Sequence, residues 1–200
     1  RQVVRKAADE RQITLKPVVR LHYVEVAEPD MHNPASDLQR LCGALEREWQ
    51  LTNLECDLAL LQTLQSQLRQ GQWAVTVAVH DNRDIIAVWP GLHERAFGLA
   101  VDIGSTTIAM HLCDLLTGNV LATSGGMNPQ IRFGEDLMSR VSYSMMNPGG
   151  ARQMTVAVRA ALNELVSQVT SAAGVEAGEI LEAAFVGNPI MHHLLLGIDP

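Results

Sequence analysis

The 200-residue chain is 47% hydrophobic and 18% charged, and its formal net charge at pH 7 is -7. This composition is typical of a globular protein that buries one good core or two small ones. No segment approaches the ~20 apolar residues of a membrane span and no secretory signal opens the chain, so the sequence argues against a membrane and indicates a cytoplasmic location. Only fifteen residues are Lys or Arg, which gives no basic surface for a nucleic-acid partner.

The three cysteines, Cys42, Cys56 and Cys113, are irregularly spaced and form no CxxC pair. They therefore predict free thiols, with neither a disulfide framework nor a zinc or iron–sulfur ligand set. The chain starts at Arg1 and stops at Pro200 inside an apparent fold, so we expect it to be a piece of a longer protein.

Residues 1–15 are polar, carry both signs of charge and are predicted to be a linker. Residues 16–93 predict a small middle domain of β-α-α-β-β order. An alternating strand begins near Val19, Ser36 and Gln39 form a capping box before a first amphipathic helix, and a second helix runs to Gly71, where we expect a left-handed C-terminal cap. Two alternating strands then complete this domain.

Residues 94–200 have a different pattern. Strands at 97–102, 108–115 and 120–124, joined by tight turns, predict an antiparallel meander. A polar loop at 128–134, a helix, a long amphipathic helix ending at Gly174, a strand at 181–186 and a helix that begins at Pro189 follow. This order is that of the ribonuclease-H-like lobe of actin-like ATPases. We therefore expect a mixed α+β or α/β fold that ends in a truncated actin-like lobe.

The segment from Ala100 to Thr107 combines the residue types that bind a magnesium-bound phosphate. Gly104 permits close approach of a ligand, and the hydroxyl and amide groups of Ser105, Thr106 and Thr107 suit phosphate oxygens. Asp102 offers the carboxylate oxygen that Mg²⁺ prefers. The same residue types form ordinary hairpin turns, and that alternative stays open, but the position inside a meander favours phosphate. The string resembles the first phosphate-binding motif of actin-like ATPases.

Three longer strings, AVDIGSTTIA, MNPQIRFGEDLMSRV and FVGNPIMHHLLLGIDP, resemble the reductive activators of corrinoid proteins, and the segment from Lys16 to Gly91 is similar to their middle domain. The resemblance implies binding and hydrolysis of ATP with Mg²⁺, coupled to electron delivery onto cobalt(II) of a corrinoid partner. The product is the cobalt(I) form that accepts a methyl group. The resemblance also implies a [2Fe-2S] cluster in an upstream domain that is absent from this chain, so we expect the fragment alone to be inactive. It also implies an external electron donor, and it leaves a homodimer open.

The site residues follow from this resemblance. Asp102 and Asp136 are expected to be catalytic, with Asp102 on the metal, and the expected nucleotide-binding residues are Asp102, Gly104, Ser105, Thr106, Thr107, Gln130, Gly187 and Asn188. Asp136 and Gln130 also have a purely structural interpretation, because polar side chains stabilise helix starts. The family usually carries Gly-Asn-Thr-Thr-Met at the last turn, whereas this chain has Pro189 and Ile190 there.

Two alternatives remain open at the sequence level. A kinase for a sugar or a carboxylic acid would use the same phosphate turn with a general base such as Asp136. A nucleotide-switched scaffold or assembly protein would use it without small-molecule turnover. Stimulation of ATP hydrolysis by an oxidised corrinoid protein, by a sugar or by polymerisation would separate the three.

Overall fold

The computed structural model describes residues 15–32 and 34–200, so all but the last residue of the predicted linker lies outside the described part. The chain divides into two compact units, whose described parts are residues 15–96 and Phe97–Pro200. From the sequence, the boundary is expected between residues 93 and 94. Within the described ranges, no helix is both long and apolar enough to cross a lipid bilayer.

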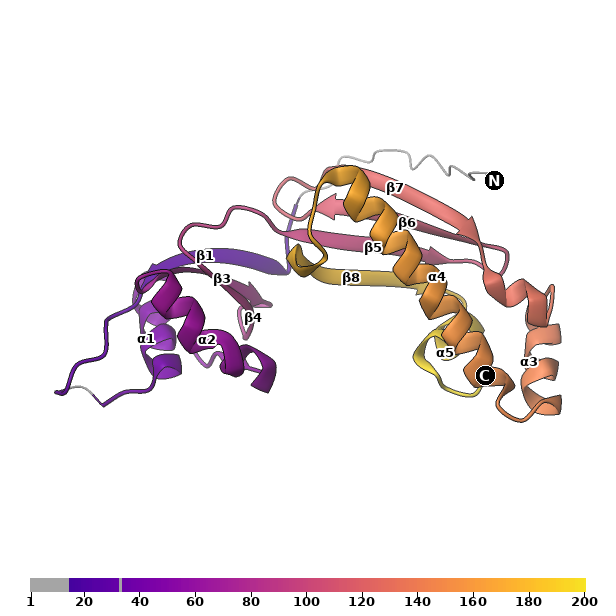
Figure 1. Cartoon of the computed structure of the whole chain (residues 1–200), viewed down its shortest axis with the longest axis horizontal. Helices are drawn as coiled ribbons and strands as arrows, with labels where there is room; N and C mark the ends of the chain where they lie inside the picture. Colours follow the sequence, from indigo (N-terminus) through magenta and orange to yellow (C-terminus); the bar gives the residue numbers. More distant parts are fainter. Residues whose placement is uncertain (1–14, 33) are drawn as a thin grey trace. The chain divides into compact units, whose positions relative to one another are not determined.

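The first unit is a four-stranded sheet with two helices (Figure 1). In chain order its elements are β1 (Val19–Glu25), α1 (Asp37–Trp49), β2 (Glu55–Cys56), α2 (Leu58–Gln70), β3 (Ala74–His80) and β4 (Asp84–Pro90). The strands lie in the order β1-β3-β4-β2, and β2 pairs in parallel with β4. The predicted order of elements is confirmed except for β2, because two residues are too few to show an alternating pattern.

Of the two helix caps predicted in the first unit, the one at Ser36 is confirmed and the one at Gly71 is wrong. The capping box is confirmed, since Gln39 donates its backbone N–H to Ser36 and accepts from the Ser36 backbone N–H in return. The left-handed cap at Gly71 is wrong, because its φ is -79° and the next two residues take positive φ values of 51° and 65°. Glycine is needed there for space, since a Cβ would lie 2.3 Å from the Ala74 carbonyl oxygen.

A buried histidine lies in this unit on β1. The His22 side chain is 7% exposed and its ring packs edge-on against Trp49 at a centroid distance of 4.8 Å. Neither ring nitrogen has a hydrogen-bond partner among the described residues. Burial, and secondarily the charge of Arg20, lower the pKa of His22 below its ordinary value of 6.5. The folded unit therefore holds a neutral imidazole.

We expect the first unit to lose stability as the pH falls below the ordinary histidine pKa. The unfolded chain binds a proton at His22 more readily than the folded one, so the stabilisation is complete above about pH 6.5 and declines as the pH drops toward the lowered folded pKa. Melting temperatures measured from about pH 5.5 to 7.5 should show this slope. His22→Leu should reduce it, and the exposed control His32→Leu should keep it. An unchanged slope in His22→Leu would contradict the assignment.

The second unit is a four-stranded sheet with helices of very different length. Its elements are β5 (Phe97–Ile103), β6 (Thr107–Asp114), β7 (Val120–Met127), the 3-10 helix η1 (Pro129–Phe133), α3 (Leu137–Met146), α4 (Gly150–Ala173), the 3-10 helix η2 (Ala177–Glu179), β8 (Ile180–Gly187) and α5 (Pro189–Leu196). The strand order is β7-β6-β5-β8, antiparallel except for the parallel pair β5–β8. The predicted meander is confirmed, and η1 replaces the predicted irregular loop.

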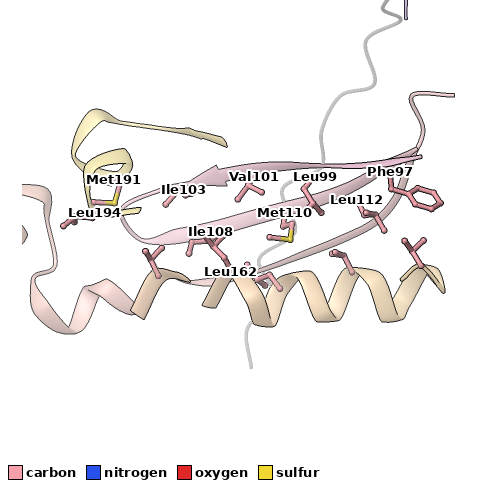
Figure 2. Packing of buried hydrophobic residues seen from close by; sticks show 14 of the residues in the cluster. Phe97, Leu99, Val101, Ile103, Ile108, Met110, Leu112, Leu162, Met191 and Leu194 are labelled. Carbon is pink, nitrogen blue, oxygen red and sulfur yellow. The ribbon is translucent and has the colours of Figure 1, made fainter. Parts of the chain in front are cut away.

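The core of this unit lies between one face of the sheet and α4, as Figure 2 shows. Leu99, Val101 and Ile103 alternate along β5 and are each at most 9% exposed. Since successive side chains of a strand point to opposite faces, Asp102 lies on the face away from this core. It is half-buried.

Strand register brings two turns to the same end of the sheet. Ile103, the last residue of β5, pairs with Ile108 of β6 and with Gly187, the last residue of β8. The turn from β5 to β6 and the turn from β8 to α5 therefore lie side by side. Met191 and Leu194 of α5 fill the core at this end (Figure 2).

Candidate functional site

The turn between β5 and β6 is tight and depends on glycine. The Gly104 backbone N–H donates to the Thr107 carbonyl oxygen at 2.9 Å and closes the turn. A Cβ at position 104 would lie 2.7 Å from that same oxygen, closer than side chains tolerate. Close packing within the turn therefore requires glycine here, whereas the predicted approach of a ligand to Gly104 stays a prediction.

The carbonyl groups of the turn are all held from one side. The Asn128 side-chain amide donates to the Gly104 carbonyl oxygen at 2.8 Å, and its backbone N–H donates to the Thr106 carbonyl oxygen at 2.8 Å. The Arg140 guanidinium donates to the Ser105 carbonyl oxygen between them. Asn128 and Arg140 are both fully buried. Three consecutive carbonyls are thus anchored to the interior.

The amides of the same turn point the other way. The turn has no cis peptide bond, and in a trans peptide the C=O and N–H groups point in opposite directions. The Ser105 and Thr106 N–H groups therefore face away from Asn128 and Arg140, and within the described part of the chain neither donates a hydrogen bond. Consecutive outward amides are the kind of donor set that can bind an anion such as phosphate.

Asp102 precedes this turn by two residues, on the sheet face away from the α4 core. Among the described residues, no cluster of three or more His, Cys, Asp or Glu side chains could hold a metal ion. A magnesium ion at Asp102 would therefore take its other ligands from phosphate oxygens and water, which is the arrangement Mg²⁺ usually adopts in proteins. The donor set of the turn and Asp102 is compatible with such a complex.

Gln130 lies buried among the residues that support the turn. Its side chain is 1% exposed, its amide nitrogen donates to the Met154 carbonyl oxygen at 3.1 Å, and its backbone N–H donates to Asn128 at 3.0 Å. In this structure the residue joins η1 to α4 and holds Asn128 beneath the turn. A direct contact of Gln130 with nucleotide stays a prediction, whereas its supporting contacts are observed.

Asp136 caps α3. One carboxylate oxygen accepts from the Ser139 backbone N–H at 2.7 Å and from the Ser139 hydroxyl at 2.8 Å. These bonds, the backbone one first, hold the pKa of Asp136 below its ordinary value. The geometry fits the helix-start interpretation, and the catalytic role expected for Asp136 stays a prediction.

Two substitutions at Asp136 separate the cap from catalysis. Asparagine caps helices about as well as aspartate but cannot act as a base, and alanine does neither. We expect Asp136→Ala to lower the unfolding free energy and Asp136→Asn to retain stability; if Asp136 acts only as a helix cap, Asp136→Asn also retains ATPase activity. Chemical unfolding and ATP hydrolysis by the full-length protein provide the measurements. Loss of hydrolysis in a stable Asp136→Asn variant would instead establish the catalytic role.

The second turn brings Gly187 and Asn188 near the first. The Asn188 side chain accepts from the Met191 N–H at 3.0 Å and caps α5, so its oxygen is already used. A Cβ at Gly187 would lie 3.0 Å from the Ile103 carbonyl oxygen. Gly187 is exposed, and the Asn188 side-chain nitrogen donates no hydrogen bond to any residue that the structure describes, so a nucleotide contact here stays a prediction.

Asn128 and Arg140, the two side chains that anchor the turn, are not among the site residues predicted from the sequence. A signal was present for Arg140, which shares a face of α3 with Leu137, Val141 and Ser144 at helical spacing. A charged residue on the inward face of an amphipathic helix needs internal partners. No comparable signal distinguishes Asn128 from an ordinary loop asparagine.

A separate open cleft of about 590 Å³ lies between η1 and the start of α4. It is lined by Arg132, Phe133, Gly149, Arg152, Gln153 and Val156. The Arg132 guanidinium stacks over the Phe133 ring at 4.7 Å. None of the predicted site residues lines this cleft.

The chain is similar to proteins that activate corrinoid proteins. Two protein-family models match it: the "RACo linker region" over residues 8–95 and the "RACo middle region" over residues 97–200. Corrinoid activation enzyme RamQ of Eubacterium limosum is 31% identical over 132 residues, which are 66% of this chain and 22% of RamQ. A solved structure titled reductive activator for corrinoid, iron-sulfur protein is 37% identical, with a TM-score of 0.81 over 98% of this chain and 31% of that one.

The chain thus spans about a fifth to a third of the length of these two relatives. The two family models meet where the two structural units meet, between Ala96 and Phe97. The family models name these units differently from the sequence-based prediction. The linker model matches where a middle domain was expected, and the middle-region model matches where the start of an ATPase lobe was expected.

Proposed function

This chain belongs to the RACo family of reductive activators of corrinoid proteins, and on that premise we propose that it contributes the phosphate-binding part of an ATP-dependent activator. The names of both relatives support a corrinoid protein as the partner. Because the chain spans only about a fifth to a third of the length of these relatives, the reaction and its partners are part of the proposal.

One observation carries the nucleotide part of the proposal. The Ser105 and Thr106 amides face away from the three anchored carbonyls and have no partner in the described structure, and Asp102 lies two residues before the turn. A chelated triphosphate would match this set, with phosphate oxygens on the amides and hydroxyls and the metal near the carboxylate. In this arrangement the β5–β6 turn belongs to an actin-like lobe formed by residues 97–200 and later parts of the protein.

The proposed reaction is the one-electron reduction of cobalt(II) of the corrinoid protein to cobalt(I), which can then accept a methyl group. The described residues of this chain offer no ligand set for an iron–sulfur cluster, so a [2Fe-2S] cluster held elsewhere would supply the electron, and an external donor would in turn supply the cluster. ATP is hydrolysed by water to ADP and phosphate. Because the electron transfer is unfavourable, nucleotide must favour one conformation of the complex over another, and this requires different affinities for the two. The residues of this chain would contribute by gripping the phosphates.

A cytoplasmic setting is part of the same proposal. Cys42, Cys56 and Cys113 are all free thiols in the structure. Burial raises the pKa of the Cys113 thiol and so favours its protonated form. Unpaired, partly buried thiols are typical of proteins in reducing compartments.

The proposal is tested with the full-length protein and an oxidised corrinoid protein from the same organism. We expect MgATP to bind, its hydrolysis to rise when the cobalt(II) protein is added, and the cobalt(I) absorption spectrum to appear only with MgATP and a reduced donor. Stimulation by a sugar or by self-assembly, with no response to the corrinoid protein, would support one of the two alternatives instead. Failure to bind MgATP at all would reject the nucleotide part.

A further inference from the structure

Arg140 has an unusual environment for a charged residue. Its side chain is 0% exposed, and it is the largest fully buried side chain in the described structure. Nε donates to the Gly134 carbonyl oxygen at 2.9 Å, one terminal nitrogen lies 3.3 Å from the Met191 sulfur, and the other donates to the Ser105 carbonyl oxygen. The guanidinium therefore connects η1's end, α5 and the β5–β6 turn.

None of these three acceptors carries a charge. Among the described residues, no carboxylate oxygen forms an ion pair with Arg140. Asp136, one helical turn earlier, is committed to capping α3. Burial lowers the pKa of Arg140, and the Asp136 charge only partly opposes this. Since arginine stays protonated in proteins, the structure holds a buried cation without a paired counter-ion.

The Arg140 guanidinium contacts the same peptide group that carries one of the outward amides. Arg140 binds the oxygen of the peptide group whose N–H belongs to Thr106. A cation on a carbonyl oxygen polarises the whole peptide group and strengthens its N–H as a donor. The same contact fixes the orientation of the peptide, and so aims the Thr106 N–H away from the protein interior.

We propose that Arg140 is a positioning residue for polyphosphate: through the Ser105 carbonyl it orients and polarises the Thr106 amide, and its charge, which has no ion-pair partner among the described residues, is balanced by the anion bound on the other side of the turn. The inference rests on the proposed nucleotide function of the turn and assigns the selectivity for highly charged ligands to α3. It also links α3 to nucleotide occupancy, because binding must then stabilise the helix that carries Arg140.

The test compares dissociation constants of the full-length protein for MgATP, MgADP and adenosine. We expect Arg140→Met to weaken MgATP at least about tenfold, MgADP less, and adenosine less than about twofold, since a charge interaction grows with phosphate number. Arg140→Lys keeps the charge and should restore most of the MgATP affinity. The matched control Arg152→Met removes an exposed arginine of the same unit and should change none of the three.

A merely structural Arg140 predicts another pattern. Equal weakening of adenosine and MgATP, equal losses in the Lys and Met variants, or no loss at all would each overturn the inference while leaving ATP binding by the wild type intact. Absence of MgATP binding by the wild type would reject the proposed function and this inference together.

A second measurement uses the wild-type protein, so it does not depend on whether the Arg140 variants fold. In the wild-type protein, hydrogen exchange of the α3 amides should slow on addition of MgATP and stay unchanged on addition of adenosine. Unchanged exchange in α3 under saturating MgATP would contradict the link between Arg140 and the bound anion.

Discussion

Asp102→Asn is expected to abolish nucleotide-dependent activation of the corrinoid protein while leaving the fold intact. The side chain lies on the sheet face away from the α4 core and is only half-buried, so an isosteric amide disturbs no apolar packing. The amide lacks the negative charge that a magnesium ion requires. Losing one charge-assisted contact of about 1.5–3 kcal/mol corresponds to roughly 10- to 150-fold weaker MgATP binding. Isothermal titration with MgATP and the rate of cobalt(I) formation measure the effect.

The matched control is Asp114→Asn at the opposite end of β6. Asp114 caps its own turn by accepting from the Leu116 N–H at 2.8 Å, and asparagine can accept the same bond. This variant should retain wild-type activation. An unchanged activation rate in Asp102→Asn would contradict a metal at Asp102. A lower melting temperature, together with activity lost only to the extent that the variant is unfolded, would instead indicate a structural role.

The fold was predictable where side-chain periodicity is long. Strands of seven or eight residues, such as β5 and β6, alternate clearly, and α4 repeats its apolar positions over 24 residues. The two-residue β2 and the 3-10 helix η1 are too short to show a period. Gly71 illustrates a different limit, because the sequence shows that a glycine is needed but not whether backbone angle or space requires it.

The tight turn between β5 and β6 was predictable from the local sequence, but the side chains that support it were not. A string of Asp, Gly, Ser and Thr between two strands predicts amides and hydroxyls in a turn, and the structure has them there. What aims them is long-range: Asn128 and Arg140 lie 24 and 35 residues from the carbonyls that they hold. Such pairings depend on how η1 and α3 pack beneath the sheet, which no local pattern encodes. Gln130 shows the converse, since a loop glutamine expected to meet a ligand is buried in this support.

Gly104→Ala is the second substitution for which we expect a large effect. The added Cβ would lie 2.7 Å from the Thr107 carbonyl oxygen, which is a backbone atom that cannot rotate away. To relieve the contact the turn must open, and the 2.9 Å bond from the Gly104 N–H to that oxygen must lengthen. Opening moves the Ser105 and Thr106 amides out of register with each other. We expect the unfolding free energy to fall by about 1–3 kcal/mol.

Nucleotide binding should suffer more than stability does in Gly104→Ala, because the donors that would hold phosphate are the groups displaced. Titration with MgATP should show affinity lowered at least about tenfold, and chemical unfolding gives the stability change for comparison. Gly178→Ala is the control, since a Cβ at position 178 meets no atom within 4 Å in the same unit. If Gly104→Ala bound MgATP normally, phosphate recognition would have to lie elsewhere than at the β5–β6 turn.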